Sequence, residues 1–463
     1  MKGTQLKSMY TFKIITLGCP LNQSESDSIA GVLKNYGFQK TVDAKSADLY
    51  VINSCTVTEK AARKSRKEAK KAKKENPAAF VCLMGCYGEM EREKIKNRIP
   101  EIDLVLGTRD RNELFEVLAK VGNCHSNQNI EGTKNLKNVE RTFYTPDLST
   151  NFAELGFADQ PEKSRPVIKI QEGCDRACTY CIVTHARGKP KSRPVEHIMK
   201  QIERLLIQGY KEIILAGTNM MLYGTDTQER MDLPGLMEKI ALLPYEFRLR
   251  LSSLEPMEIE TDLLDVMAKY SKICNFLYLP LQSGSDKILS LMDRQYTTGE
   301  FSDLIQTAKH RMPDIGVITD LIVGFPGETH EDHQVTMDFI QELQLSKLHV
   351  FQFSPRPGTK AANFKNQIRP DIKKQRADAL KKVNETLTYK FHCNNIDRIL
   401  RVLIENNENR GSKHYLEGFS DNYCRAGTFL SDESTKTMDK GDFITVIGDQ
   451  AKTWGILGKL CKL

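Results

Sequence analysis

The chain has 463 residues, of which 40% are hydrophobic and 27% are charged, and its mean hydropathy of −0.44 is ordinary for a globular protein. No stretch approaches the roughly 20 apolar residues of a membrane span, and residues 1–10 lack the apolar core of a secretory signal, so we expect a cytoplasmic protein with no membrane partner. The net charge of +7 indicates an anionic partner only weakly. In a reducing compartment, twelve cysteines favour metal ligation or catalysis over disulfides.

Residues 11–123 alternate strand and helix signals, which predicts a domain with a parallel sheet. Its short apolar runs occupy residues 13–19, 49–55, 80–86 and 103–107. Cys19, Cys55 and Cys86 each end one of these runs, and strand carboxyl ends share one edge of a parallel sheet. Three cysteines in equivalent places favour a metal cluster over three buried thiols, whereas Cys82, in mid-strand, is expected to be packed.

A basic run, residues 60–74, reads as a helix in this domain. A solvated surface is the ordinary interpretation of such a run, and contact with RNA is the alternative. Residues 124–159 then lose periodicity and gain Asn, Ser, Thr and Pro, which is typical of a linker.

Residues 160–392 carry a second series of strands and helices. The strand candidates are residues 167–171, 212–216, 248–252, 276–281, 317–323 and 347–353, separated by amphipathic runs such as 195–207 and 301–311, and a charged helix near 374–389 closes the domain. Six strand–helix units are too few for a closed eight-stranded barrel, so we expect a partial barrel or an open parallel sheet.

Residues 393–463 change character. Short strands are predicted at residues 402–405, 415–419, 423–428 and 443–447, with Gly and Asn-Glu turns between them. Such a pattern predicts a small all-β barrel. Trp454, the sole tryptophan, is expected in its core, with RNA stacking as the alternative.

The clearest chemical signal follows the first strand of the central domain. Cys174, Cys178 and Cys181 form a C-x3-C-x2-C run, and three thiolates at this spacing wrap one corner of a four-iron cubane. The fourth iron stays open, which is typical of a reactive site rather than a structural one. A zinc site would need a fourth ligand at matched spacing, and only His185 lies near.

Polar residues follow the other central strands, at the edge where barrel sites lie. Candidate cofactor-binding residues are Gly217, Thr218, Asn219, Ser253, Glu255, Gln282 and Arg356, and simple turns or loop caps are the alternative. Arg187 and Arg193 are further candidates for pairing with a phosphate or carboxylate, and we expect only one of the three arginines, Arg187, Arg193 and Arg356, to do so.

The cysteine run resembles the radical S-adenosylmethionine superfamily, and the chain as a whole resembles the methylthiotransferases within it. The matching stretches are Leu17–Ser26, Ile52–Ala61, Met84–Glu89, Ile170–Val183, Arg250–Pro256, Leu279–Asp286, Asp320–Thr329 and Phe353–Ala362. Two departures, Thr184 where these enzymes commonly carry Pro and the run 216–221, remove no cluster ligand.

This resemblance implies two [4Fe–4S] clusters. Cys174, Cys178 and Cys181 match the ligands of the catalytic cluster, on which S-adenosylmethionine is cleaved to a 5′-deoxyadenosyl radical. Cys19, Cys55 and Cys86 match the ligands of an auxiliary cluster linked to the sulfur that is inserted. A second S-adenosylmethionine donates the methyl group, and a donor such as flavodoxin or ferredoxin supplies electrons. The C-terminal barrel resembles the TRAM module, which binds RNA.

Three branches of the family differ in substrate. The local runs at residues 55–58, 171–176 and 354–356 most resemble the branch that converts N6-threonylcarbamoyladenosine at position 37, in the anticodon stem-loop of tRNA, to its 2-methylthio derivative. The alternatives are N6-isopentenyladenosine-37 of tRNA and an aspartate of a ribosomal protein. A non-enzymatic iron–sulfur protein that binds RNA or senses redox state is the alternative from another class.

Overall fold

The computed structural model describes residues 10–43, 47–121, 142–143, 152–157, 161–229, 231–411, 413–430 and 438–461. The chain divides into two units: the first runs to Glu162 and also includes Glu172–Arg176 and Cys181–Lys191, and the second holds the rest. Most of the predicted linker, with Cys124, lies outside the described residues. Within the described ranges, no helix is long and apolar enough to cross a membrane.

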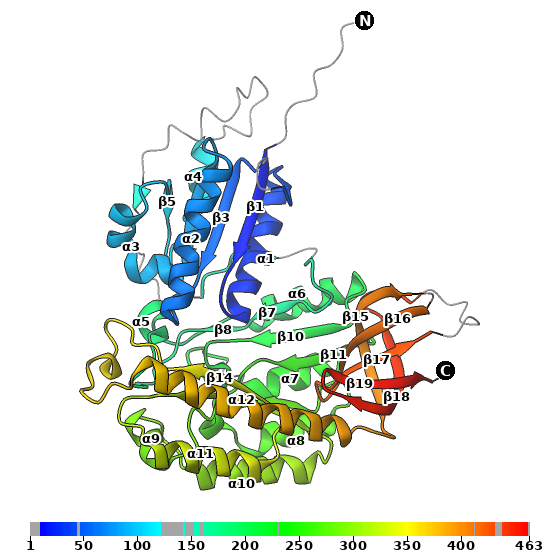
Figure 1. Cartoon of the computed structure of the whole chain (residues 1–463). Coiled ribbons are helices and arrows are strands. Elements are labelled where there is room, and N and C mark those ends of the chain that lie inside the picture. Colours follow the sequence, from blue (N-terminus) through cyan, green and yellow to red (C-terminus); the bar gives the residue numbers. More distant parts are fainter. Residues whose placement is uncertain are drawn as a thin grey trace, which may run out of the picture. The chain divides into compact units, whose positions relative to one another are not determined.

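Unit 1 is built on a six-stranded sheet in the order β2-β1-β3-β4-β5-β6, in which every pairing is parallel (Figure 1). The strands are β1 (Thr11–Thr16), β2 (Gln39–Lys40), β3 (Leu49–Ser54), β4 (Phe80–Gly85), β5 (Leu104–Val105) and β6 (Thr142–Phe143). The predicted parallel sheet is therefore confirmed. Its order reverses between β1 and β3, and at such a point the loops after the two strands diverge and leave space for a ligand.

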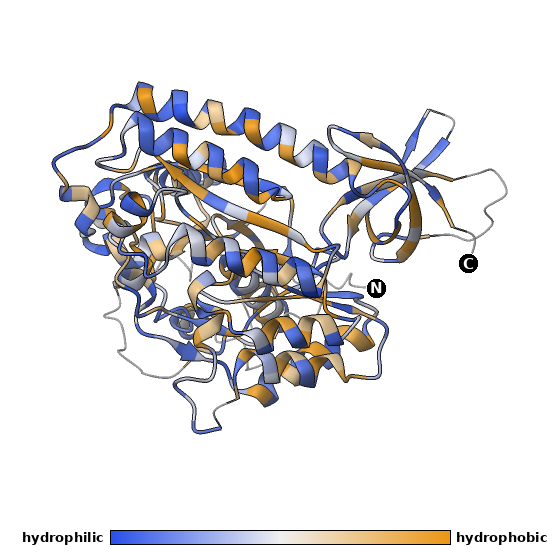
Figure 2. Ribbon diagram, turned by 90° about the horizontal axis from the view of Figure 1, so that it is seen from below, coloured by the Kyte–Doolittle hydropathy of each residue, from blue (hydrophilic) through white to orange (hydrophobic). Residues whose placement is uncertain are grey.

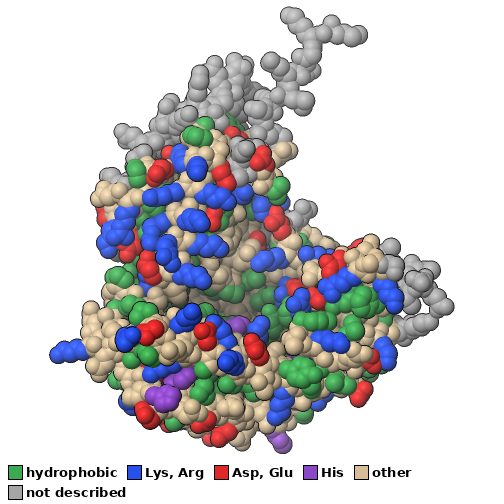
Figure 3. Space-filling model, viewed as in Figure 1, with side chains coloured by type: hydrophobic (Ala, Val, Ile, Leu, Met, Phe, Trp, Pro, Cys, Tyr) green, Lys and Arg blue, Asp and Glu red, His purple; other side chains and the backbone are tan. Residues whose placement is uncertain are grey.

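Helices cover both faces of this sheet. They are α1 (Pro20–Asn35), α2 (Glu59–Glu75), α3 (Cys86–Arg98) and α4 (Glu113–Val121). Side chains of α1 and α4 share one apolar cluster with the strands, and side chains of α2 and α3 share another. Helix α2 buries only three alanines and a serine, so most of its basic side chains face solvent, and Figure 3 shows Lys and Arg gathered over this face.

Unit 2 contains six parallel strands in two three-stranded sheets, β11-β10-β7 and β12-β13-β14. Their bounds are β7 (Val167–Lys169), β10 (Glu212–Ala216), β11 (Arg248–Leu251), β12 (Phe276–Tyr278), β13 (Gly316–Val323) and β14 (Lys347–Gln352). A parallel bridge from Leu249 to Ile273, and a hydrogen bond from Leu254 N to Tyr278 O of 2.9 Å, connect the two sheets. The arrangement is the predicted six-stranded partial barrel. Two short strands, β8 (Gln171–Glu172) and β9 (Lys191–Ser192), flank the segment that carries the second cysteine set.

Helices pack around the partial barrel and enclose the largest apolar cluster. They are α6 (Val195–Ile207), α7 (Leu233–Ala241), α8 (Thr261–Lys269), α9 (Asp286–Leu291), α10 (Thr298–Arg311), α11 (His330–Leu343) and α12 (Pro370–Cys393), while α5 (Val183–Arg187) belongs to unit 1. The charged helix α12 begins four residues before the predicted run, at Pro370, whose missing N–H costs nothing in the first helical turn.

The end of unit 2 is a closed five-stranded barrel, in the order β15-β16-β17-β19-β18 (Figure 2). Its strands are β15 (Ile399–Arg410), β16 (Lys413–Ser420), β17 (Arg425–Phe429), β18 (Phe443–Lys452) and β19 (Gly455–Leu460). The sequence predicted four of them and missed β19, where glycines interrupt the apolar alternation. Gly458 is needed there because a Cβ would lie 2.3 Å from the Ile447 carbonyl oxygen.

Charged residues at the amino ends of β10 and β11 connect the partial barrel to the closed barrel. Arg248 and Arg250 both pair with Glu212, through Nε contacts of 2.8 and 2.7 Å. The same guanidinium groups donate to barrel carbonyls, Arg248 to Phe419 O (2.8 Å) and Arg250 to Ser420 O (3.0 Å). The closed barrel therefore covers the amino ends of these strands and leaves their carboxyl ends for a site.

Candidate functional site

Three cysteines of unit 1 follow adjacent parallel strands. Cys19 follows β1, Cys55 follows β3, and Cys86 follows β4 as the first residue of α3. The loops after β1 and β3 touch, because a Cβ on Gly18 (φ +103°) would lie 3.0 Å from Cys55 Sγ. Cys55 and Cys86 are buried and Cys19 is exposed. The structure thus places all three at one sheet edge, beside the point where the strand order reverses.

Side-chain amides hold these strand ends together. Asn22 Nδ2 donates to Leu17 O (2.6 Å) and to Ser54 O (3.0 Å), which clamps the chain after β1 to the end of β3. Asn53 Nδ2 donates in return to Asn22 O (2.9 Å). Ser54 Oγ donates to Met84 O (2.5 Å) and so reaches β4. Sequence reasoning missed these residues, although Asn22 and Asn53 stand near the cysteines in the matched motifs.

A buried charge network lies beside the same cysteines. Arg187 Nη1 contacts Glu25 Oε1 (2.9 Å) and Glu172 Oε1 (2.7 Å), and Arg111 Nη2 lies 3.0 Å from Glu25 Oε1. The four side chains are at most 6% exposed. Burial raises the pKa of Cys86 to about 12, and Arg187 opposes that increase. Arg187 therefore favours the thiolate form that iron binding requires.

The donor set of unit 1 suits a cluster rather than a single ion. In the described part of the chain, no three His, Cys, Asp or Glu side chains converge closely enough for one metal ion. A cubane binds each thiolate at a different iron, so its ligands surround a space instead of meeting at a point. Three thiols at one sheet edge, with an arginine to balance their charge, fit this group. Cys82 differs from them, since it is fully buried in the sheet core, as predicted.

Hydrogen bonds to sulfur mark the second cysteine set. Backbone amides donate to two of its thiols, Arg176 N to Cys174 Sγ and Val183 N to Cys181 Sγ, each at 3.4 Å. Arg294 Nη1 donates to Cys178 Sγ, also at 3.4 Å. Donors aimed at sulfur stabilise the thiolate and raise the potential of a bound cluster, so these residues also fit an iron–sulfur group.

Close contacts and hydrogen bonds fix the backbone path of the segment that carries these thiols. Gly173 has a φ of +82°, and a Cβ there would lie 1.9 Å from the Lys189 carbonyl oxygen. In unit 2, Thr179 N donates to Met292 O (3.0 Å) and Thr179 Oγ1 donates to Leu291 O (2.9 Å). Thr179, which lies between Cys178 and Cys181, is therefore anchored to the segment just before Arg294.

Arg294 is the main residue that sequence reasoning missed. Besides Cys178 it pairs with Glu255, and it lies 4.9 Å above the ring of Tyr296, with its side chain 5% exposed. Tyr296 OH donates in turn to Leu281 O (2.8 Å). An isolated arginine after a short helix carries no pattern that separates it from a surface residue.

The other predicted residues of unit 2 lie at the carboxyl ends of its strands. Gly217, Thr218 and Asn219 follow β10, Ser253 and Glu255 follow β11, Gln282 follows β12, and Arg356 follows β14. Asn219 is committed to protein groups, because it caps Met221 N (3.2 Å) and donates to Glu258 (2.8 Å). Gln282 has a φ of +72°, a conformation that non-glycine residues rarely adopt and that often marks a functional site. Their roles stay predictions.

The candidate arginines Arg187 and Arg193 bind protein groups. Arg187 belongs to the network of unit 1, and Arg193 Nη1 donates to Gln201 Oε1 at 2.5 Å. Arg356 is buried, and its carbonyl oxygen accepts from Thr359 Oγ1 at 2.8 Å.

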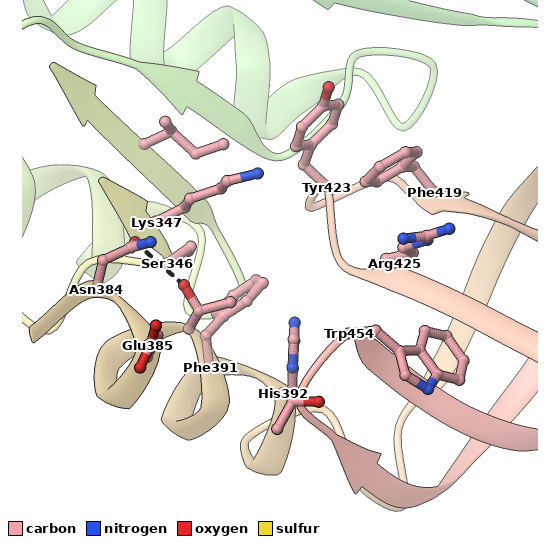
Figure 4. Close-up of a pocket in the computed structure, with 13 residues that line it drawn as sticks. Ser346, Lys347, Asn384, Glu385, Phe391, His392, Phe419, Tyr423, Arg425 and Trp454 are labelled. Carbon is pink, nitrogen blue, oxygen red and sulfur yellow. Dashed lines mark hydrogen bonds between the residues drawn. The ribbon is translucent and has the colours of Figure 1, made fainter. Parts of the chain in front are cut away.

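The expected place of Trp454 in the barrel core is wrong. Trp454 is half-buried in the turn between β18 and β19 and lines a cavity (Figure 4). The core consists of aliphatic side chains such as Val402, Leu416 and Ile456. A hairpin turn lies at the end of a barrel, so its side chain points past the end rather than into the interior.

Two family models match the chain. Residues 11–107 match uncharacterized protein family UPF0004, and residues 168–340 match the radical SAM superfamily. The chain is 34% identical to the threonylcarbamoyladenosine tRNA methylthiotransferase MtaB of Bacillus subtilis, over 96% of this chain and 98% of that protein. It is 32% identical to the tRNA-2-methylthio-N(6)-dimethylallyladenosine synthase of Pelotomaculum thermopropionicum, over 87% of this chain and 88% of that protein.

Among solved structures, the chain resembles the radical S-adenosylmethionine methyltransferase TsrM of Kitasatospora setae, with a TM-score of 0.54. The two are 14% identical, and the match covers 77% of this chain and 75% of the other. At this identity the likeness concerns the fold alone, and it agrees with a sheet domain followed by a partial barrel.

Proposed function

Because this chain belongs to the radical SAM tRNA methylthiotransferase family, whose members use S-adenosylmethionine and [4Fe–4S] clusters, we propose that it methylthiolates N6-threonylcarbamoyladenosine at position 37 of tRNA. The product would be the 2-methylthio derivative. The observation that carries this proposal is the presence in one chain of two cysteine sets, one at a sheet edge and one in a loop with donors aimed at sulfur.

Cys19, Cys55 and Cys86 are proposed to hold the auxiliary cluster, and Cys174, Cys178 and Cys181 the catalytic one. When bound, the clusters and S-adenosylmethionine supply the electron, the radical, the sulfur and the methyl group of the reaction. The chain's own residues orient these groups. Arg294 donates a hydrogen bond to the Cys178 sulfur, and Arg187 lowers the pKa of the Cys86 thiol against the effect of burial.

Gly217, Thr218, Asn219, Ser253, Glu255, Gln282 and Arg356 are proposed to bind S-adenosylmethionine. Backbone groups after β10 suit its amino group, and a buried guanidinium suits its carboxylate. Asn219 would act through its backbone, since its side chain already has partners.

The exposed basic face of α2 and the C-terminal barrel are proposed to bind the anticodon stem-loop. Rows of Lys and Arg on one helix face supply the phosphate contacts that dominate affinity for RNA. A one-electron donor of the flavodoxin or ferredoxin type would supply electrons to the catalytic cluster.

The threonylcarbamoyl substrate is favoured by three local runs, at residues 55–58, 171–176 and 354–356, and relatives of that name match at 32–34% identity. Isopentenyladenosine is the second candidate, because relatives of that name match at 32–34% identity. An anaerobic assay with two tRNA anticodon stem-loops that differ only in the N6 group separates them. Faster methylthiolation of the isopentenyl substrate would overturn the first choice.

Cys174→Ala tests the reaction class. Nucleosides from a deletion strain, read by mass spectrometry, should lack the 2-methylthio product, and the parent gene should restore it while the variant does not. Reconstituted parent protein should bind about eight irons per chain and the variant about four. An unchanged tRNA profile in the deletion strain would instead favour a protein substrate or a non-enzymatic role.

A further inference from the structure

A cavity of about 570 Å³ lies in unit 2, and no cysteine of either set lines it. Helix α12, the amino ends of β13 and β14, and two turns of the closed barrel form its wall, as Figure 4 shows. Its volume is in the range of pockets that hold small ligands. None of the residues predicted from the sequence to bind S-adenosylmethionine or iron lines it.

Aromatic faces dominate the barrel side of this cavity. Phe419 and Tyr423 stack on each other with ring centroids 4.6 Å apart, and Arg165 and Arg250 lie over them. Trp454 projects from the turn between β18 and β19 and supplies the indole face at the cavity. Tyr423 adopts a φ of +65°, which is uncommon for a bulky residue and costs about 1–3 kcal/mol. Strain of this kind persists where the surroundings hold a side chain in a required place.

Polar groups on the opposite wall match the edge of a nucleobase. His392 is 4% exposed, and its Nδ1 donates to Lys452 O at 2.8 Å, so Nε2 of the neutral ring is an acceptor. Burial and then Lys347 lower the pKa of His392, which keeps the ring neutral. Asn384 Oδ1 accepts from Leu348 N (2.7 Å), so the side-chain NH2 group remains as a donor.

Two cations stand at the cavity, Lys347 at the start of β14 and Arg425 at the start of β17. Arg425 lies 5.8 Å from the centre of the Trp454 ring and is ion-paired with Glu417, so Lys347 is the cation that faces a ligand. One wall residue, Glu385, carries a negative charge. The indole of Trp454, an acceptor, an amide donor and the Lys347 ammonium together match a nucleotide, whose base is flat and whose phosphate is anionic.

We propose that this cavity binds one unstacked nucleotide of the RNA substrate, distinct from the nucleotide that is modified. The inference rests on the proposed function, because that function supplies the RNA substrate. Ile318 and Lys347 lie at the amino ends of β13 and β14, whereas Gln282 and Arg356 lie at the carboxyl edge. Six residues of β14 span roughly 20 Å, so a nucleotide in the cavity is too remote to be the reacting one.

Trp454 is the sole tryptophan, so the protein carries its own reporter of this cavity. Tryptophan fluorescence of the reconstituted enzyme is measured while one of three ligands is added: a single-stranded oligoribonucleotide, a tRNA or adenosine 5′-monophosphate. The Trp454→Phe variant is the blank. We expect saturable quenching by both RNAs, because a base stacked on indole quenches its emission. No quenching by either RNA overturns the proposal.

Variants then link the cavity to RNA affinity. Trp454→Ala and Lys347→Glu should each weaken tRNA binding by about tenfold, measured by anisotropy of a labelled stem-loop. Matched controls outside both the cavity and the closed barrel are Tyr36→Ala, an aromatic that is 37% exposed directly after α1, and Lys269→Glu on α8. Both should bind RNA like the parent. Circular dichroism and iron content verify that each variant is folded.

The outcomes separate this inference from the proposed function. Quenching and weaker binding without any methylthiolated product would retain the cavity and reject the reaction. Methylthiolation with an unchanged KM in Trp454→Ala would reject the cavity and retain the reaction. Quenching by adenosine 5′-monophosphate alone, with none by RNA, would identify a free nucleotide as the ligand and overturn the assignment to RNA.

Discussion

The two cysteine sets reach their places by different means. Cys19, Cys55 and Cys86 are separated by more than thirty residues of chain from one another, and a parallel sheet aligns them. Cys174, Cys178 and Cys181 lie within eight residues, and each sulfur accepts a hydrogen bond from an amide or guanidinium group. The first set depends on packing between strands, and the second depends on donors and charge.

This difference predicts which substitutions each set tolerates. Added volume should damage the first set, because glycines and buried amides hold its strand ends in contact. Loss of charge should damage the second, because Arg294 pairs with Glu255 and bonds to Cys178 at once.

Gly18→Ala should have the largest effect, the loss of the auxiliary cluster. Its Cβ would lie 2.9 Å from Cys55 Cβ, in a backbone of φ +103°. Reconstituted iron should fall from about eight to about four per chain. Gly37→Ala is the control, since Gly37 also has a positive φ (+85°) but nothing within 4 Å of a Cβ. Full iron content in Gly18→Ala would show that packing does not set this site.

Arg294→Met should act on the second set and leave the iron content nearly unchanged. Removing the guanidinium leaves the Glu255 carboxylate without its ion pair in a mostly buried site, which costs about 3 kcal/mol of unfolding free energy. Loss of a donor to Cys178 Sγ should also lower the midpoint potential of the catalytic cluster, read by redox titration with electron paramagnetic resonance. Arg294→Lys keeps the charge and should recover part of the potential.

Acid should lower the free energy of unfolding of unit 2, because the cluster around Glu212 depends on a charged carboxylate. Burial by itself would raise the pKa of Glu212, but Arg250, Arg248 and Arg165 lower it to about 2, from 4.5 in an unfolded chain. A lowered pKa stabilises the folded state above pH 4.5, and this contribution of about 3 kcal/mol is lost as the pH falls towards 2. Urea unfolding of Glu212→Gln should lack this part of the pH dependence. Parallel slopes in parent and variant would contradict it.

Asn22→Ala should have the smallest effect of the four, about 2 kcal/mol of unfolding free energy. It removes three buried hydrogen bonds: two to the Leu17 and Ser54 carbonyls, and one that Asn22 Oδ1 accepts from Arg187 Nη2 at 2.7 Å. Gln23→Ala, next along α1, removes a partly exposed bond to Asp27 and should leave the urea midpoint unchanged. Equal urea midpoints for the two variants would show that the hydrogen bonds of Asn22 do not stabilise the strand ends that carry the first cysteine set.

The same contrast explains what could be predicted from the sequence. The C-x3-C-x2-C run is local, so its spacing alone indicates the second set. Cys19, Cys55 and Cys86 could be predicted because each ends an apolar run, and because the carboxyl ends of parallel strands share one edge of the sheet. Arg294 was missed because its partners, Glu255 and Cys178, are 39 and 116 residues away in the chain. Strand β19 was missed because glycines interrupt its apolar alternation. The position of Trp454 was missed because this residue lies in a turn, where the side chain points away from the barrel core.

The acceptors that complete the Glu212 cluster come late in the chain. Phe419 O and Ser420 O, which bind Arg248 and Arg250, are 171 and 170 residues downstream of them. At a translation rate of about 5–20 residues per second, roughly 10–30 s pass between synthesis of these arginines and of their partners. Until then the nascent chain keeps the amino ends of β10 and β11 in water. The closed barrel, synthesised later, therefore completes the charged cluster of strands that were synthesised well before it.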